Sequence, residues 1–143
     1  PNSLQADLSG NTWVLCGGKP EWTGMETAGK LIKISANHDI LSSFDFDLTE
    51  HPQHLTLLGD AIFYNLDARV YKMPVNSNTV PEAPFKGLEG SFYYMTGHGG
   101  EIYATDAGDY QSEGNLYIYD AADGSLLKTV KTGIIPGWIV FQE

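Results

Sequence analysis

Two segments that connect predicted β-strands carry most of the side chains that could bind a ligand. Residues 17–29 and 106–114 are both bounded by or rich in glycine, and both combine an aromatic residue with polar ones. An aromatic ring supplies contact area at little entropic cost, while carboxylates and amides fix a ligand's orientation. These segments predict a site for a large, partly flat ligand. The candidate residues, including a histidine from a third connecting segment, are Trp22, Tyr110, Glu21, Asp109, Gln111 and His51.

A purely structural role for these residues is the alternative. Trp22 could fold back over its own loop, Tyr110 could cap the sheet beneath it, and His51 could shape the entry to the next strand. The sequence leaves both roles open.

Metal chemistry has weaker support. Asp106, Asp109 and Glu113 could hold Ca²⁺ through carboxylate oxygens, but they lack the closely alternating Asp, Asn and Gly pattern of a calcium loop. His51 and His54 are three residues apart, so on an extended strand their rings would point to opposite faces. We therefore expect neither a metal nor a cofactor.

Catalysis is the rival class of function. If the fold encloses a central channel, as a β-propeller does, paired carboxylates across that channel could support a hydrolase or lyase acting on glycans. The chain has no Gly-x-Ser-x-Gly motif, and its single cysteine, Cys16, has no evident catalytic partner. These observations favour a non-catalytic protein, while a protein-interaction scaffold is a further alternative.

The elements that would position these residues form a repeat. Trp13, Phe63 and Tyr103 lie in similar strand-like segments that are 50 and 40 residues apart. A mean period of roughly 45 residues is typical of β-propeller blades, each of which has four strands. Starts of the form Pro-x-x-apolar mark a preceding strand, since proline is tolerated at the first residue of a strand.

The expected fold is all-β: a β-propeller fragment of about three four-stranded antiparallel blades plus one extra terminal strand. The expected blades are residues 1–50, 51–88 and 89–134, followed by a closing strand at 135–143. The third blade should begin at 89–92, and the fourth strand of the second blade, the least regular, should cover 78–85. A small β-sandwich is the alternative architecture, but it does not require the strands to recur in order.

An incomplete ring needs a partner. Propellers typically close with four to eight blades, and an apolar terminal strand without neighbours would be an exposed edge. We therefore expect an N-terminal half of the same propeller, or a second copy, to complete the ring. The formal net charge of −10, with no basic cluster, makes nucleic acid an unsuitable partner.

Three sequence segments carry a resemblance to a known family. Residues 10–18 (GNTWVLCGG), 104–120 (ATDAGDYQSEGNLYIYD) and 133–137 (GIIPG) resemble the C-terminal part of the Bacteroidetes cell-surface propeller lipoproteins of the YncE-like, DUF5074 type. The resemblance implies a parent of about seven blades, located at the cell surface or in the periplasm. It further implies a lipid anchor at an N-terminus absent from this chain. Members of that family include surface proteins that capture corrinoids, which are vitamin B12-like nutrients, beside an outer-membrane transporter.

Overall fold

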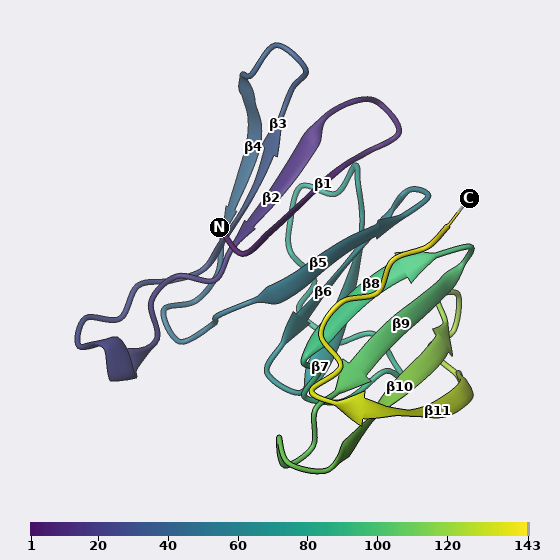
Figure 1. Ribbon diagram of the computed structural model, residues 1–143. Coiled ribbons are helices and arrows are strands. Elements are labelled where there is room, and N and C mark those ends of the chain that lie inside the picture. The colour runs from purple at the N-terminus through teal and green to yellow at the C-terminus, as the bar shows by residue number, and fades with distance from the viewer. Residues whose placement is uncertain (143) are drawn as a thin grey trace.

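The computed structural model describes residues 1–142, and in that part of the chain the fold is all-β. Over residues 1–142, eleven strands form three antiparallel sheets, and the only helical element is one 3-10 turn, η1 (Glu21–Thr23). The first sheet has the order β1-β2-β3-β4, the second β5-β6-β7 and the third β11-β10-β9-β8 (Figure 1). The strands are β1 (Ser3–Ala6), β2 (Thr12–Cys16), β3 (Lys30–Ile34), β4 (Ile40–Asp45), β5 (Gln53–Leu58), β6 (Ala61–Leu66), β7 (Arg69–Pro74), β8 (Tyr94–His98), β9 (Glu101–Asp106), β10 (Glu113–Asp120) and β11 (Leu126–Ile134).

Each sheet is a meander in which consecutive strands are hydrogen-bonded neighbours. The expected all-β class is thus confirmed, and the aromatic residues Trp13, Phe63 and Tyr103 occupy the second strand of each sheet. Positive φ angles at His38 (69°) and Asp67 (54°) lie in tight turns between strands, where Asn, Asp and His adopt the left-handed conformation most readily among non-glycine residues.

The prediction of four strands in the second sheet is wrong. Residues 78–85 form no strand, and the sheet ends at β7. Pro81 and Pro84 fall in this segment, and proline has no N–H to donate to a ladder. The edge of β7 is partly covered instead by the chain that follows, because the N–H of Phe85 donates to the Val70 carbonyl at 2.7 Å.

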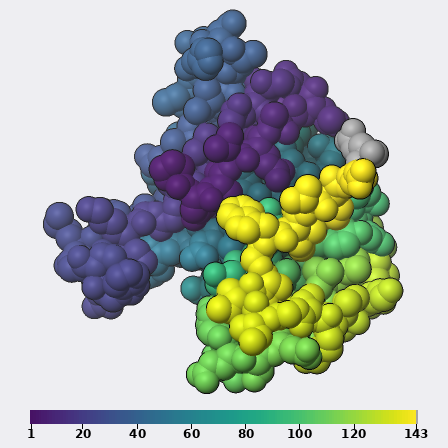
Figure 2. Space-filling view, in the orientation of Figure 1, coloured from purple at the N-terminus to yellow at the C-terminus, as the bar shows by residue number. Residues whose placement is uncertain are grey.

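The start of the third sheet and the expected closing strand also differ from expectation. The third sheet begins at Tyr94 rather than at 89–92, where Glu89 makes only an isolated bridge with Arg69. Residues 135–142 form no strand ladder, so the predicted closing strand is absent over those residues, and residue 143 lies outside the described part of the chain. This segment lies across the third sheet near β8, where it is visible in yellow in Figures 1 and 2.

The second sheet is the centre of the core because it is buried on both faces. Within β6, Tyr64 belongs to the apolar cluster shared with Trp13 and Leu31 of the first sheet. The neighbouring Phe63 belongs to a second cluster, shared with Met95 and Ile102 of the third sheet. Successive side chains of a strand point to opposite faces, so one strand supplies both clusters.

The first strands of the three sheets lie side by side, with β5 between β1 and β8 (Figure 1). Side chains of each strand bind the backbone of the next. The N–H of Leu57 in β5 donates to Oε1 of Gln5 in β1 at 2.7 Å, and the N–H of Gly97 in β8 donates to Oγ1 of Thr56 in β5 at 2.8 Å. These bonds satisfy edge N–H groups that have no strand partner on that side.

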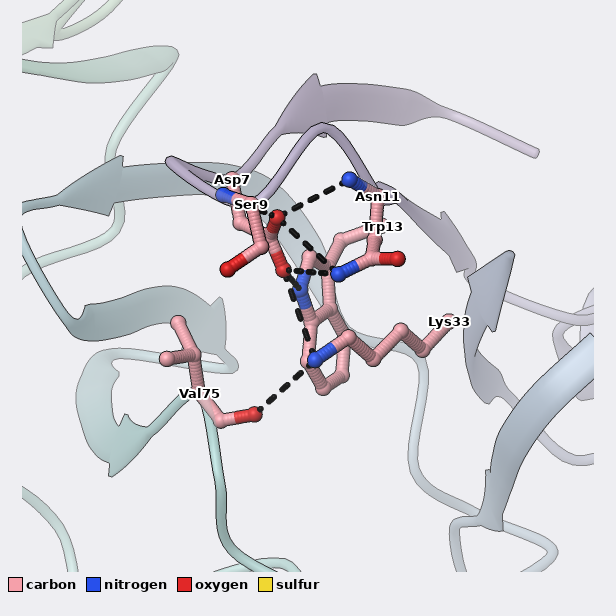
Figure 3. A network of polar contacts seen from close by, with 6 residues as sticks. All are labelled: Asp7, Ser9, Asn11, Trp13, Lys33 and Val75. Carbon is pink, nitrogen blue, oxygen red and sulfur yellow. Dashed lines mark hydrogen bonds and ion pairs between the residues drawn. The ribbon is translucent and has the colours of Figure 1, made fainter. Parts of the chain in front are cut away.

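A buried ionic network joins the first two sheets (Figure 3). The Asp7 carboxylate accepts hydrogen bonds from the N–H groups of Ser9 and Asn11, the Asn11 amide and the Trp13 indole. Lys33 lies 3.4 Å from Asp7 Oδ2 and also donates to the carbonyl of Val75, the residue that follows β7 of the second sheet. Burial alone would raise the pKa of Asp7, but the hydrogen bonds outweigh it and lower the pKa to about 2.

Candidate functional site

Three of the connecting segments emerge at one end of the three sheets. The β2–β3 segment with η1, the β9–β10 segment and the chain entering β5 all lie towards the lower side of Figure 1. The second and third strands of every sheet join at the same end, so the repeat brings the β2–β3 and β9–β10 segments to one side.

A groove runs across this end of the molecule. It consists of two hollows, with volumes of about 470 and 270 Å³, that share Gln53, Ser91 and Phe92 in their walls. The remaining wall residues of the larger hollow are Tyr93, Asp106, Ala107, Gly108 and Tyr110, and those of the smaller are His51, Asn65 and Asp67. The structure therefore brings two sequence candidates, Tyr110 and His51, to opposite ends of one groove.

Tyr110 forms an aromatic wall with Tyr93. The two rings meet edge to face, with centroids 5.8 Å apart and an interplanar angle of 78°. The Tyr110 backbone is held at φ 63°, and its N–H donates to the Ala107 carbonyl. The side chain is 57% exposed, so its ring can still be covered by a ligand.

Asp109 and Asp106 shape the loop that presents Tyr110. Asp109 Oδ1 accepts the N–H groups of Gln111 and Ser112 at 3.0 and 2.7 Å, and the bond from Ser112 is the main reason that the pKa of Asp109 is lowered. Asp106 Oδ1 likewise accepts the N–H of Gly108 at 2.8 Å. Both aspartates thus cap turns of their own loop.

The structure gives no separate support to a metal site. In the part of the chain that the structure describes, no three His, Cys, Asp or Glu side chains are grouped so that they could hold a metal ion. Glu113, the third carboxylate of the candidate calcium set, is an exposed residue at the start of β10.

His51 ties the base of the β2–β3 segment to the entry of β5. Its Nδ1 lies 2.7 Å from the Gly17 carbonyl oxygen, and its Nε2 lies 3.1 Å from Oε1 of Glu26. Both partners are acceptors, so both ring nitrogens must carry a proton to donate to them. The Gly17 carbonyl, and then Glu26, raise the pKa of His51 above its usual value.

Trp22 and Glu21 lie outside the groove. They form η1 at the tip of the projecting β2–β3 segment, where Trp22 is 85% exposed. The base of this segment is closed by backbone bonds between Lys19 and Thr27. Gln111 is also absent from the groove wall.

Sequence reasoning did not select eight groove residues: Gln53, Asn65, Asp67, Ser91, Phe92, Tyr93, Ala107 and Gly108. Asn65 lies near the end of β6 and Asp67 lies in the tight turn between β6 and β7, which the repeat places at the same end as the β2–β3 and β9–β10 segments. That topological position was the available signal for them. Gln53, Ser91 and Tyr93 enter the groove only through the path of the chain into β5 and β8.

A separate hollow, of about 410 Å³, lies between the first strands of the sheets and the C-terminal segment. Most of its polar groups already hold strands together. Gln5 accepts an N–H from β5, Asn2 donates to the Pro52 carbonyl, and His54 Nε2 bonds to the Phe92 carbonyl. Burial is the main reason that the pKa of His54 lies below its usual value. The groove at the loop end is the better binding candidate, because its wall includes the exposed polar residues Gln53, Asp67 and Ser91.

The scan against family models finds no match for this chain, and the search of curated proteins finds none either. Within residues 1–142, no helix has the length and apolar character needed to cross a bilayer.

Proposed function

We propose that the three sheets are blades of a β-propeller and that the chain serves as a non-catalytic ligand-binding module. The arrangement of the first strands supports the propeller. β1, β5 and β8 lie in sequence around one region, and each leans on the next through the same kind of side-chain to backbone bond. In this proposal a parent of about seven blades is completed by an N-terminal half or by a second copy.

The groove is the observation that carries the binding function. It joins an aromatic wall, made by Tyr93 and Tyr110, to the exposed polar side chains of Gln53, Ser91 and Asp67. A concave surface with aromatic area and a few polar groups is the usual form of a small-molecule site. Its wall contains the two carboxylates of Asp67 and Asp106 against one histidine, His51, and no Lys or Arg, which favours a neutral or cationic ligand.

A corrinoid is the ligand class that we propose to test first. It combines a large flat ring system with amide side groups, which suits an aromatic wall beside amide and carboxylate groups. The biological setting in this proposal is capture at the cell surface or in the periplasm by a lipid-anchored protein, for an outer-membrane transporter.

Calorimetric titration with cyanocobalamin tests the proposal. We expect binding by the wild-type chain and about tenfold weaker binding by Tyr110→Ala, which removes the exposed ring from the groove wall. Trp22→Ala is the matched control, since it removes an even more exposed ring that lies outside the groove.

Equal weakening by the two variants would place the ligand elsewhere on the loop end. No heat of binding by folded wild-type protein would exclude the corrinoid, and the same result across a panel of neutral and cationic aromatic ligands would exclude the groove as the site.

A further inference from the structure

The C-terminal segment continues the series of first strands, although it has no ladder of its own. The first strands of the three sheets can be aligned by their pairings with the second strands, in which Gln5, Thr56 and Thr96 are opposite Trp13, Phe63 and Tyr103. We call the position of Gln5, Thr56 and Thr96 the central position of a first strand. Gln5 and Thr56 each follow a proline, Pro1 or Pro52, by four residues, and Val140 follows Pro136 by the same interval.

Contacts in the structure support this register. A Cβ on Gly29 would collide with the ring of Pro52, and a Cβ on Gly114 would collide with the ring of Pro136. Lys33 and Ile118 are the residues paired with Trp13 and Tyr103, so Gly29 and Gly114, each four residues earlier, are equivalent. Pro136 therefore sits on the third sheet as Pro52 sits on the first.

Two further pairs of contacts agree. Two residues before the central position, the His54 ring packs on Tyr94, with centroids 6.2 Å apart, and the Tyr94 ring packs on Trp138 at 5.0 Å.

One residue after the central position, Gly97 is packed so closely on Leu58 that a Cβ would overlap it. Phe141 is the equivalent of Gly97, one residue after Val140, and its ring stacks on His98 with centroids 4.2 Å apart. His98 and Leu58 are themselves equivalent, each two residues after the central position.

The segment is thus anchored by its side chains while its backbone is left open. Among the described residues, no backbone hydrogen bond joins Gly137–Phe141 to another strand. Trp138 and Val140 are 85% and 89% exposed. An extended, anchored segment with unpaired N–H and C=O groups is what a β-strand adds to in strand-augmentation complexes.

We infer that residues 137–141 are the first strand of a further sheet and bind an antiparallel β-hairpin that another polypeptide segment supplies. In all three complete sheets the second strand places an aromatic residue opposite the central position. The partner hairpin accordingly carries an aromatic residue opposite Val140. This inference rests on the proposed propeller arrangement and is independent of the ligand groove.

The register also specifies which groups pair. Leu57 and Gly97, one residue after the central position, direct their N–H groups to the preceding sheet. N–H groups alternate in direction along a strand, so those of Trp138 and Val140 face the incoming hairpin, while that of Phe141 faces Thr96.

The probe is a synthetic peptide of residues 60–75, which contains the β6–β7 hairpin and its tight turn, added to the isotope-labelled chain. We expect the amide hydrogen exchange of Trp138 and Val140 to slow by about tenfold or more, while that of Ile139 changes little. Val140→Pro removes one of the required N–H groups and should weaken peptide binding by about tenfold, whereas Val140→Thr should bind within about twofold of wild type.

Absence of binding, or equal binding by Val140→Pro and Val140→Thr, would overturn the inference. So would protection that appears at the free edges of β4 or β11 in place of residues 137–141, or self-association of the chain through those edges without the peptide. None of these results bears on cyanocobalamin binding, so failure of this inference and failure of the proposed groove can be told apart.

Discussion

The second sheet packs against the first sheet on one side and the third sheet on the other, and we call these contacts the first and second junctions. Each junction contains a lysine at the same position of its sheet, but the charge of that lysine is stabilised differently. Lys33 and Lys72 are paired with Trp13 and Phe63 in their sheets. Each ammonium lies over that ring, at 5.0 and 5.1 Å from the centroid. Each also donates to a carbonyl just after a strand of the next sheet, Lys33 to Val75 after β7 at 3.4 Å and Lys72 to Ala121 after β10 at 2.7 Å.

The difference lies in the remaining partner. Lys33 has the carboxylate of Asp7, which is 4% exposed, whereas Lys72 has a second aromatic ring, Phe85, at 4.7 Å. The first junction therefore depends on a charge that protonation can remove, and the second does not. In the third sheet the equivalent residue is Ile118, paired with Tyr103. This position in the third sheet therefore has no lysine that could bind a following sheet.

Removing the Asp7 carboxylate should have the largest effect. Asp7→Ala leaves the Lys33 ammonium and the Trp13 indole N–H without their partner, and we expect a loss of about 3 kcal/mol in the free energy of unfolding. Urea denaturation measures it. A loss below about 1 kcal/mol would show that water replaces the carboxylate and that the network adds little to the first junction.

Replacing Lys33 should lower the free energy of unfolding more than replacing Lys72. Lys33→Met leaves a buried carboxylate without its cation and should cost about 2 kcal/mol, while Lys72→Met loses one hydrogen bond and a cation–π contact and should cost about 1 kcal/mol. Methionine keeps most of the apolar stem in both variants, so each is the control for the other. Equal losses would remove the distinction between the junctions.

Acid should act on the first junction alone. The pKa of Asp7 is lowered from 3.8 to about 2 in the folded protein, so its stabilising contribution is present above pH 3.8 and is lost as the pH falls towards 2. Stability measured from pH 5 to pH 2 should fall less steeply in Asp7→Asn than in wild type. Lys72→Met should keep the wild-type slope, and a flattened slope in that variant would contradict the assignment.

His51 should give the smallest effect and the opposite sign. The folded-state pKa of His51 is raised above 6.5, so the bonds to Gly17 and Glu26 stabilise the protein below that pH and are lost as the pH rises through the folded-state value. We expect faster amide exchange in residues 17–29 at pH 8 than at pH 6, after correction for intrinsic rates. His51→Gln should remove most of this difference, and a variant that retains it would exclude the histidine as its cause.

The sequence predicted the repeat but not every strand. The aromatic residues Trp13, Phe63 and Tyr103 located the second strand of each sheet, because strand patterning is local and recurs with the period. The segment 78–85 was expected to be a strand and is not, since its prolines outweigh the repeat. The start of the third sheet was placed too early, because no proline marks it.

The candidate site was predicted in part for a similar reason. Tyr110 and His51 were identified by residue type and loop position, and both line the groove. Trp22 met the same criteria but lies at the tip of a projecting segment, whose direction depends on the Lys19–Thr27 closure and on His51. Such long-range contacts have no signature in a single sequence.

The central claim is that each first strand rests on the preceding one in a fixed register and that residues 136–142 continue it. Nuclear Overhauser effects between aromatic rings test this most directly. The account predicts cross-peaks between Tyr94 and Trp138 and between His98 and Phe141, whose ring centroids are 5.0 and 4.2 Å apart. Random-coil shifts for residues 136–142 with neither cross-peak, or cross-peaks that pair Trp138 with His98, would contradict it.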